Sequence, residues 1–187
     1  MFIEILGLFF GIAYIISMIR EKWIAWPLGF LAVSLYAYSC FQSQLYGEFF
    51  LQMIYAILAI YGWYSWRKNT HSHLKISKLS NFQYITAILG GVSISLLSFY
   101  LLKSLESSLP VLDGITNGFA IVATILAARK KIENWIFWIP INATTIWMML
   151  LKGMPFYAVL YFCYMMFAIL GYFQWKKALR SNLKLQS

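Results

Sequence analysis

The segment ENWIFWIPIN, residues 133–142, opens an apolar stretch of the length that crosses a lipid bilayer as a helix. It carries two tryptophans, Pro140 and Asn142, which are not typical of a surface that faces lipid tails. An amide such as that of Asn142 is unfavourable in hydrocarbon unless it finds a hydrogen-bonding partner. The segment therefore predicts a membrane helix that faces other helices or an aqueous path along part of its surface.

The composition of the whole chain agrees with a membrane location. Of its 187 residues, 61% are hydrophobic and only 11% are charged, against about 25% charged residues in soluble domains. The net charge of +9 comes from basic residues in short clusters between apolar stretches. Clusters of this kind are typical of signals that orient a membrane protein, so nucleic-acid binding is not implied. Cys40 and Cys163 lie in separate apolar segments and are interpreted as packing residues. The sequence thus predicts an all-α integral membrane protein.

Hydrophobic stretches divide the chain into seven predicted spans. The first span has no basic residue ahead of it and no small-residue cleavage site before Arg20. We therefore expect it to remain as a spanning helix and not to be removed as a signal peptide. The predicted spans cover residues 3–19, 23–41, 46–66, 82–102, 113–128, 134–151 and 155–175.

Most basic residues lie on one side of these predicted spans. Only Lys103 and Lys152 fall in connections on the other side. By the positive-inside rule, we expect the amino terminus outside and the carboxyl terminus in the cytoplasm. The predicted cytoplasmic set consists of Arg20, Lys22, Arg67, Lys68, Lys75, Lys78, Arg129, Lys130, Lys131, Lys176, Lys177, Arg180 and Lys184.

Two regions of the chain resemble each other. The stretch EKWIAW at 21–26 matches ENWIFW at 133–138. The pattern predicts seven helices in a 3+1+3 plan of parallel repeats: residues 1–68 as the first repeat, 69–112 as a cytoplasmic loop and linker helix, and 113–187 as the second repeat and tail. The substrate site of such a protein is expected near the bilayer midplane between the repeats, and the alternative is chance similarity among Trp-rich segments. A second matched set consists of Tyr55, Ala59, Gly62 and Trp66, which recur with the same spacing as Tyr164, Ala168, Gly171 and Trp175.

One face of the predicted sixth helix carries candidate binding residues. Trp135, Trp138 and Asn142 stand at positions i, i+3 and i+7, so they share that face. Asn142 lies near the middle of the span and is interpreted as a binding residue, the alternative being a hydrogen bond to a neighbouring helix. Trp23 and Trp135 lie beside charged loops and fit an aromatic belt at the membrane interface. Trp26 and Trp138 lie a turn deeper and are better candidates for ligand contact.

Two further helices present matched polar and aromatic faces. Their small residues permit close helix contact, and their aromatic and amide side chains suit a flat heteroaromatic ligand, especially a positively charged one. The alternative is an ordinary aromatic core. Asn117, an amide in the fifth predicted helix, is a further candidate. The two faces consist of Gln52, Tyr55, Ala59 and Gly62, and of Tyr161, Tyr164, Ala168 and Gly171.

The titratable residues give no sign of catalysis or ion coupling. All six acidic residues fall at the ends of spans or in loops, so no proton relay or buried cation site is predicted and uncoupled diffusion is the simplest mechanism. The HSH stretch at 71–73 lacks the further ligands of a metal site. Because no nucleophile–base pair and no glycine-rich phosphate loop is present, we expect no enzyme activity, no cofactor and no direct ATP drive.

The stretches ARKKIENWIFWIPIN at 128–142 and QLYGEFFLQMIYAILAIYGWYSW at 44–66 resemble the PnuC family of bacterial vitamin transporters. The likeness runs from about Trp23 to Trp175. It implies a SWEET-like fold in the bacterial inner membrane and import of nicotinamide riboside by facilitated diffusion, with trapping by a cytoplasmic kinase. The ending AVLYFCYMMFAILGYFQWKK at 158–177 is closer to the thiamine-transporting branch, whereas Asn142 favours the riboside.

The resemblance also implies roles for the candidate residues. Trp135, Trp138 and Asn142 match the family's tryptophan–asparagine signature, and Gln52 and Tyr55 lie in the other matching run. A phosphorylated ligand should be rejected, because no basic residue lies at midspan to neutralise it. The expected contacts are the ligand ring for Trp26 and Trp138, its amide for Asn142, and its hydroxyls for Gln52, Tyr55 and Asn117, with Tyr161 as the counterpart of Gln52 and Tyr164 as that of Tyr55.

Two other classes of protein stay open at this point. The first is a membrane receptor or assembly subunit that binds the vitamin without moving it. The second, a membrane-embedded enzyme, needs catalytic groups at depth that the sequence does not show. The expected partners are the vitamin and the lipid bilayer, and assembly into a homo-oligomer is left open.

Overall fold

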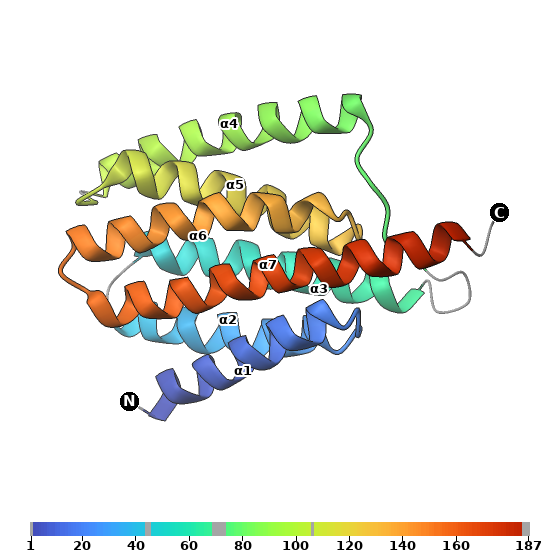
Figure 1. The fold of residues 1–187 in the computed structure, drawn as a ribbon. Helices are drawn as coiled ribbons and strands as arrows, with labels where there is room; N and C mark the ends of the chain where they lie inside the picture. The colour runs from blue at the N-terminus through green and yellow to red at the C-terminus, as the bar shows by residue number, and fades with distance from the viewer. Residues whose placement is uncertain (1, 44–45, 69–73, 106, 185–187) are drawn as a thin grey trace. The chain divides into compact units, whose positions relative to one another are not determined.

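The computed structural model describes residues 2–43, 46–68, 74–105 and 107–184, which fold into seven helices (Figure 1). The helix ends lie within three residues of the predicted spans, except that the last helix continues past Trp175 to Lys184. The HSH stretch at 71–73 lies outside the described residues. The helices are α1 (Phe2–Ile19), α2 (Ala25–Gln42), α3 (Tyr46–Lys68), α4 (Asn81–Ser104), α5 (Pro110–Ala128), α6 (Glu133–Leu151) and α7 (Pro155–Lys184).

Four of the described helices are long and apolar enough to cross a membrane. In the described part of the chain α6 is not among them, because Asn134, Asn142 and its tryptophans interrupt the apolar residues. On α4 the large side chains of Phe82, Ile85 and Leu97 are exposed, which suits lipid and not water. These helices confirm the predicted all-α membrane protein. The four spans are Tyr46–Arg67, Asn81–Ser104, Pro110–Ala128 and Pro155–Ser181.

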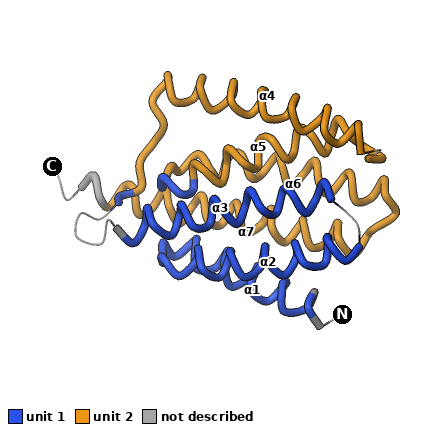
Figure 2. The backbone as a smooth tube through the Cα atoms, turned by 180° about the vertical axis from the view of Figure 1, so that it is seen from behind, with its two compact units in different colours: residues 1–75, 127–130 blue, residues 76–126, 131–187 orange. Residues whose placement is uncertain are grey.

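Two compact units make up the chain (Figure 2). Unit 1 comprises residues 1–75 and the short segment 127–130, and in it α1 packs against α2 and α2 packs against α3. Unit 2 comprises residues 76–126 and 131–187, and in it α6 packs against α7. The end of α5 therefore belongs with the first three helices, although it is distant from them in sequence.

Two helix ends share the same backbone conformation. After α1 and α5, the chain passes through a left-handed residue, Glu21 at φ 55° and Lys130 at φ 49°. Each of these N–H groups bonds the carbonyl three residues back, and the next N–H bonds the carbonyl five residues back, with N···O distances of 2.9–3.1 Å. The residue numbers of the two turns differ by 109. Their side chains also pair, because Lys130 Nζ lies 3.1 Å from Glu21 Oε2.

In unit 1 the indole of Trp26 is enclosed, with 1% of the residue exposed. Its ring meets that of Trp66 edge to face, with centroids 5.6 Å apart and planes at 85°. Gly62 of α3 lies against the indole so closely that even a β-carbon would overlap it. Trp66 in turn donates from Nε1 to the carbonyl of Ala128 at 3.1 Å. The absence of a side chain at Gly62 is thus what lets α3 approach α2 at this point.

Unit 2 repeats this arrangement at the start of α6. Trp135 is 4% exposed and meets Trp175 edge to face at 5.5 Å and 87°. A β-carbon on Gly171 would lie 2.7 Å from the Trp135 indole. The numbers of all three residues exceed those of their counterparts in unit 1 by 109. Trp135 is therefore the structural equivalent of Trp26.

This equivalence corrects the predicted match of 21–26 with 133–138, which pairs Trp26 with Trp138. The predicted match is displaced by three residues, about one helical turn. Both stretches contain the spacing W-x-x-W, at Trp23 and Trp26 and at Trp135 and Trp138, so the displaced alignment still superimposes tryptophan on tryptophan. The packing partners Gly62 and Trp66, and Gly171 and Trp175, which the second matched set pairs with the same offset of 109, decide the correct register.

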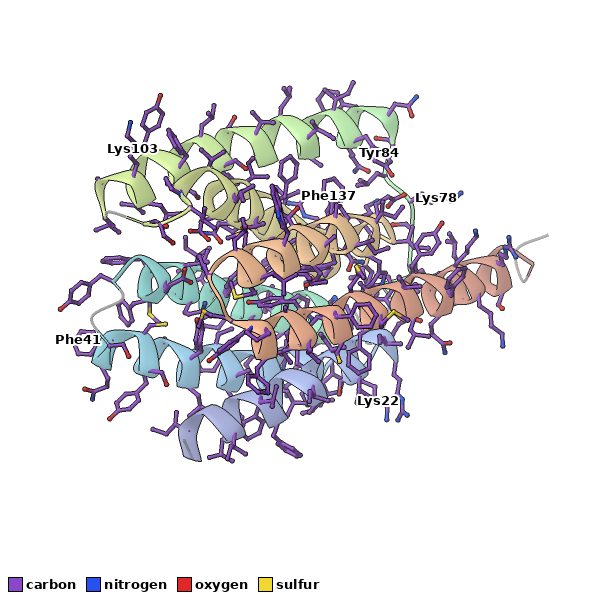
Figure 3. All side chains as sticks on the ribbon, turned by 60° about the vertical axis from the view of Figure 1, so that its left-hand side comes forward. Lys22, Phe41, Lys78, Tyr84, Lys103 and Phe137 are labelled. Atoms are coloured by element: carbon purple, nitrogen blue, oxygen red, sulfur yellow. The ribbon has the colours of Figure 1, made fainter. Side chains whose placement is uncertain are left out.

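Glycines also bring α4 and α5 together within unit 2. A β-carbon on Gly114 of α5 would lie 3.0 Å from the backbone of Phe99 on α4, and Gly118 is one turn further along the same face. The side chain of Phe137 points into unit 2 (Figure 3), where it stacks on Phe119 with ring centroids 6.1 Å apart. Close backbone packing of this kind is typical of helices in membranes.

We expect Gly62→Ala to destabilise the protein, because the added β-carbon would overlap the Trp26 indole and push α3 from α2. Overpacking of this kind costs about 1–3 kcal/mol. The measurement is the melting temperature of the detergent-purified protein. Gly90→Ala is the matched control, since no atom lies within 4 Å of a β-carbon there, and its melting temperature should not fall. Equal losses in the two variants would contradict the packing described for Trp26.

Candidate functional site

In unit 1 the candidate residues lie on two helices. Trp26 is on α2, and Gln52 and Tyr55 share one face of α3 with Gly62. Gln52 is 7% exposed and Tyr55 is half-buried, so this face is turned inward as predicted. The indole N–H of Trp26 is buried and has no acceptor among the described residues. Unit 1 therefore contains a buried donor that a polar ligand atom or a water can satisfy.

The predicted interface position of Trp135 is wrong. Trp135 is 4% exposed, whereas Trp23, which was predicted to lie in the same belt, is 44% exposed. The reason is that Trp135 packs against Gly171 of α7, a contact that its place beside a charged loop does not reveal. Within the described residues its indole N–H, like that of Trp26, is buried without an acceptor. The two equivalent tryptophans thus each hold an unused donor.

The polar side chains in the middle of α6 bond to their own helix. Asn142, 4% exposed, donates from Nδ2 to the carbonyl of Trp138 at 2.9 Å, and Thr145 Oγ1 donates to the carbonyl of Ile141 at 2.9 Å. Because a carbonyl can only accept, this bond fixes the orientation of the Asn142 amide and leaves Oδ1 as its acceptor for a ligand. In the part of the chain that the structure describes, Asn142 makes no hydrogen bond to another helix. The packing alternative for Asn142 is therefore disfavoured.

The other candidates of unit 2 lie on α5 and α7. Tyr161 and Tyr164 meet edge to face, with ring centroids 5.8 Å apart and planes at 85°, and both are half-buried. Asn117 is half-buried on α5, and no hydrogen bond joins it to either tyrosine in the described ranges. The structure thus brings the two tyrosines together and leaves Asn117 apart from their contact.

Two buried polar residues at the start of α6 were not among the predicted site residues. Glu133 is 4% exposed and Asn134 is 0% exposed. Asp113 is also buried, but its carboxylate receives Lys152 Nζ at 3.3 Å and Ser107 Oγ at 2.7 Å. The sequence prediction placed these acids at span ends, where the structure also has them, but it did not predict that Glu133 is buried. The hydropathy pattern predicts where a helix ends, but it does not predict which residues pack against that end.

Among the described residues, buried donors and acceptors that lack partners lie on α2 and at the start of α6. In lipid such groups are unfavourable, and they mark paths or sites for polar solutes. The fold and these side chains therefore fit the class of membrane proteins that bind a polar solute.

Comparison with known proteins makes the class specific. The chain belongs to the nicotinamide mononucleotide transporter family, whose sequence model matches residues 1–177. It is similar to the nicotinamide riboside transporter PnuC of Neisseria mucosa, 28% identical over 92% of this chain and 71% of that protein. The PnuC of Escherichia coli is 26% identical over 96% of this chain and 87% of that protein. The riboflavin/roseoflavin transporter RibM of Streptomyces davaonensis is 26% identical over 92% of this chain and 81% of that protein.

A solved structure supports the same family. The crystal structure of the vitamin B3 transporter PnuC has a TM-score of 0.78 to this chain at 27% identity, covering 96% of this chain and 83% of that one. Because the family and the structural neighbour are transporters, the chain is a membrane transporter and not an enzyme. The predicted family is confirmed.

The different environments of two tryptophans predict different effects on stability. We expect Trp135→Ala to lower the free energy of unfolding by about 3–5 kcal/mol, because it empties a buried indole site. Trp23→Ala, the control, removes an exposed indole and should change the melting temperature little. Thermal unfolding followed by tryptophan fluorescence measures both. A loss in Trp23→Ala as large as that in Trp135→Ala would contradict the assignment of the buried position.

Proposed function

We propose that this transporter imports nicotinamide riboside across the bacterial inner membrane. The observation that carries the proposal is the Asn142 amide, whose Nδ2 is committed to the Trp138 carbonyl while Oδ1 can accept from the carboxamide of the ligand. In the unit that contains Asn142, the indole N–H of Trp135 can donate to a ribose oxygen, and in unit 1 the indole N–H of Trp26 is a further donor. Half-buried Trp138 supplies an aromatic face for the positively charged ring. The names of two relatives, the PnuC proteins of Neisseria mucosa and Escherichia coli, support the same substrate.

Further contacts to the ligand are proposed for the remaining candidates. In unit 1 these are Gln52 and Tyr55, as partners of ligand hydroxyls. In unit 2 they are Asn117, Tyr161 and Tyr164, of which the two tyrosines already contact each other.

The proposed mechanism is facilitated diffusion. A neutral amide and indole groups can bind the ligand without a coupled ion, and cytoplasmic phosphorylation would consume free substrate and keep the gradient directed inward. The proposed topology has the amino terminus outside and the carboxyl terminus in the cytoplasm, on the side of the basic connections. Residues 1–68 and 113–187 are proposed as two parallel three-helix repeats of a SWEET-like plan joined by 69–112. Whether the chain acts alone or as a homo-oligomer does not enter this mechanism.

Binding by titration calorimetry tests the substrate. We expect nicotinamide riboside to bind the detergent-purified protein, and Asn142→Ala to weaken binding about tenfold, which corresponds to about 1.4 kcal/mol. Gln174→Ala, which changes an exposed amide on α7, is the matched control and should bind as the native protein does. Nicotinamide mononucleotide should bind poorly for lack of a basic partner. Preferred binding of thiamine, or of riboflavin as the name of RibM suggests, would contradict the substrate but keep the family.

Flux in liposomes tests the mechanism. In vesicles that contain only the purified protein, labelled nicotinamide riboside should enter until the inside and outside concentrations are equal. Enclosing a riboside kinase with ATP should allow uptake to continue, because the phosphorylated product leaves the equilibrium. Accumulation above the outside concentration without the kinase would contradict uncoupled transport. Binding without any flux would favour the membrane receptor.

A further inference from the structure

One oxygen of the buried carboxylate at the start of α6 has no hydrogen-bond donor among the described residues. Glu133 is 4% exposed, and its Oε2 is buried without a hydrogen-bond donor among the described residues. Its neighbour Asn134 is fully buried and donates from Nδ2 to the carbonyl of Lys131 at 2.7 Å. Asn134 Oδ1 is likewise buried and, within the described ranges, has no donor. Acceptor oxygens on two adjacent residues are thus shielded from water and have no hydrogen-bond donor among the described residues.

Among the described residues, a second buried carboxylate, that of Asp113, has a different environment. Asp113 also lies in the first turn of a helix and is 9% exposed, but Lys152 and Ser107 each contact one of its oxygens. An ionised carboxylate held away from water is unfavourable unless a cation or several donors compensate it. Asp113 thus has a cation and a hydroxyl donor, whereas Glu133 Oε2 has neither among the described residues.

The turn itself does not require these polar side chains. In unit 2 the N–H of Asn134 bonds the carbonyl of Lys131 at 3.1 Å, and in unit 1 the N–H of Ala25 bonds that of Lys22 at 3.0 Å. The positions equivalent to Glu133 and Asn134 are Ile24 and Ala25. Because the same backbone forms there with apolar side chains, a role in building the turn does not account for the acid and the amide.

Tyrosines of α4 and α7 belong to the same unit as Glu133. Glu133 and Tyr172 of α7 both act electrostatically on the Tyr84 hydroxyl of α4. Tyr84 lies at the end of α4 that is near Lys78 and opposite Lys103 (Figure 3). A carboxylate attracts an organic cation, and so does the face of a tyrosine ring such as that of Tyr172.

The neighbouring lysines are engaged elsewhere. Lys131 Nζ donates to the carbonyl of Lys78 at 3.1 Å, and Lys176 Nζ lies over the Tyr172 ring, 5.4 Å from its centroid. Among the described residues, no lysine or arginine forms an ion pair with Glu133. Lys131 and Lys176 therefore do not act as counter-ions of Glu133.

We propose that Glu133 and Asn134 form a binding site for a positively charged heteroaromatic ring at the end of α6 that adjoins the basic turn 129–131. The proposal rests on the proposed function, in which the transported ring is a cation. A cation that passes this end meets the ammonium group of Lys131, which donates to the Lys78 carbonyl and repels the cation. The carboxylate of Glu133 offsets this repulsion, and the oxygen of Asn134 accepts a hydrogen bond from the ligand. The site thus makes passage selective for a cationic ring over a neutral ring of the same shape.

A pair of ligands that differ in charge tests this selectivity. Nicotinamide riboside is a cation, whereas its 1,4-dihydro form is neutral and of nearly the same size. We expect native protein in liposomes to transport the cation faster, and Glu133→Gln to reduce the cation-to-neutral ratio about tenfold with little change for the neutral form. Glu48→Gln, an acid in the first turn of α3, is the control and should keep the native ratio. The ratio is independent of the amount of folded protein, so partial loss of a variant does not affect it.

A second measurement does not depend on the transported substrate. 1-Methylnicotinamide is a cation and nicotinamide is neutral, and we expect only the former to raise the melting temperature of the native protein, an effect lost in Glu133→Gln. If this difference is found but nicotinamide riboside is not transported, the proposed function fails and the cation site stands. No difference between the two compounds, or an equal loss for cation and neutral ligand in Glu133→Gln, would overturn the site. Stabilisation by sodium over N-methylglucamine that requires Glu133 would assign the site to an inorganic cation and also overturn it.

Discussion

The close approach of an indole to a glycine is the contact on which the rest of the structure depends. In unit 1 Trp26 lies against Gly62, and in unit 2 Trp135 lies against Gly171. In a membrane, apolar side chains gain little from leaving lipid, so close van der Waals packing must hold helices together. A large flat ring against a bare backbone supplies such packing over a wide area. It also sets the position of each neighbouring residue on α3 and α7, including the polar candidates on the same faces.

This packing leaves polar atoms in defined places. Both indole N–H groups are buried without acceptors among the described residues. On α6 the amides of Asn134 and Asn142 each donate to a carbonyl of their own segment, which leaves their oxygens as acceptors. Buried groups of this kind are unfavourable in the empty protein and become favourable when a ligand meets them. The same geometry therefore explains why a transporter keeps polar groups at positions where a stable core would exclude them.

The two buried carboxylates in the part of the chain that the structure describes differ in how their charge is compensated. Asp113 is compensated by Lys152, so it serves the structure at the start of α5. Glu133 stands at the start of α6 without such compensation in the described residues. A helix amino terminus favours a nearby negative charge, but only by about 0.3–1 kcal/mol at exposed sites, which does not replace a missing counter-ion. The difference between the two acids cannot be read from their positions in the sequence, since both fall in the first turn of a helix.

The sequence by itself determined the membrane class, the number of helices and their approximate ends. These follow from the length and composition of apolar stretches, which the bilayer constrains directly. It also placed Gln52, Asn142 and the glycine-containing faces correctly, because a helical period decides which residues share a face. Only the tertiary structure decided that Trp135 is buried, that Trp26 corresponds to Trp135 and not Trp138, and that Glu133 is enclosed without a counter-ion. The physical reason is that burial and pairing depend on the neighbouring helices, and a local pattern along the chain contains no information about them.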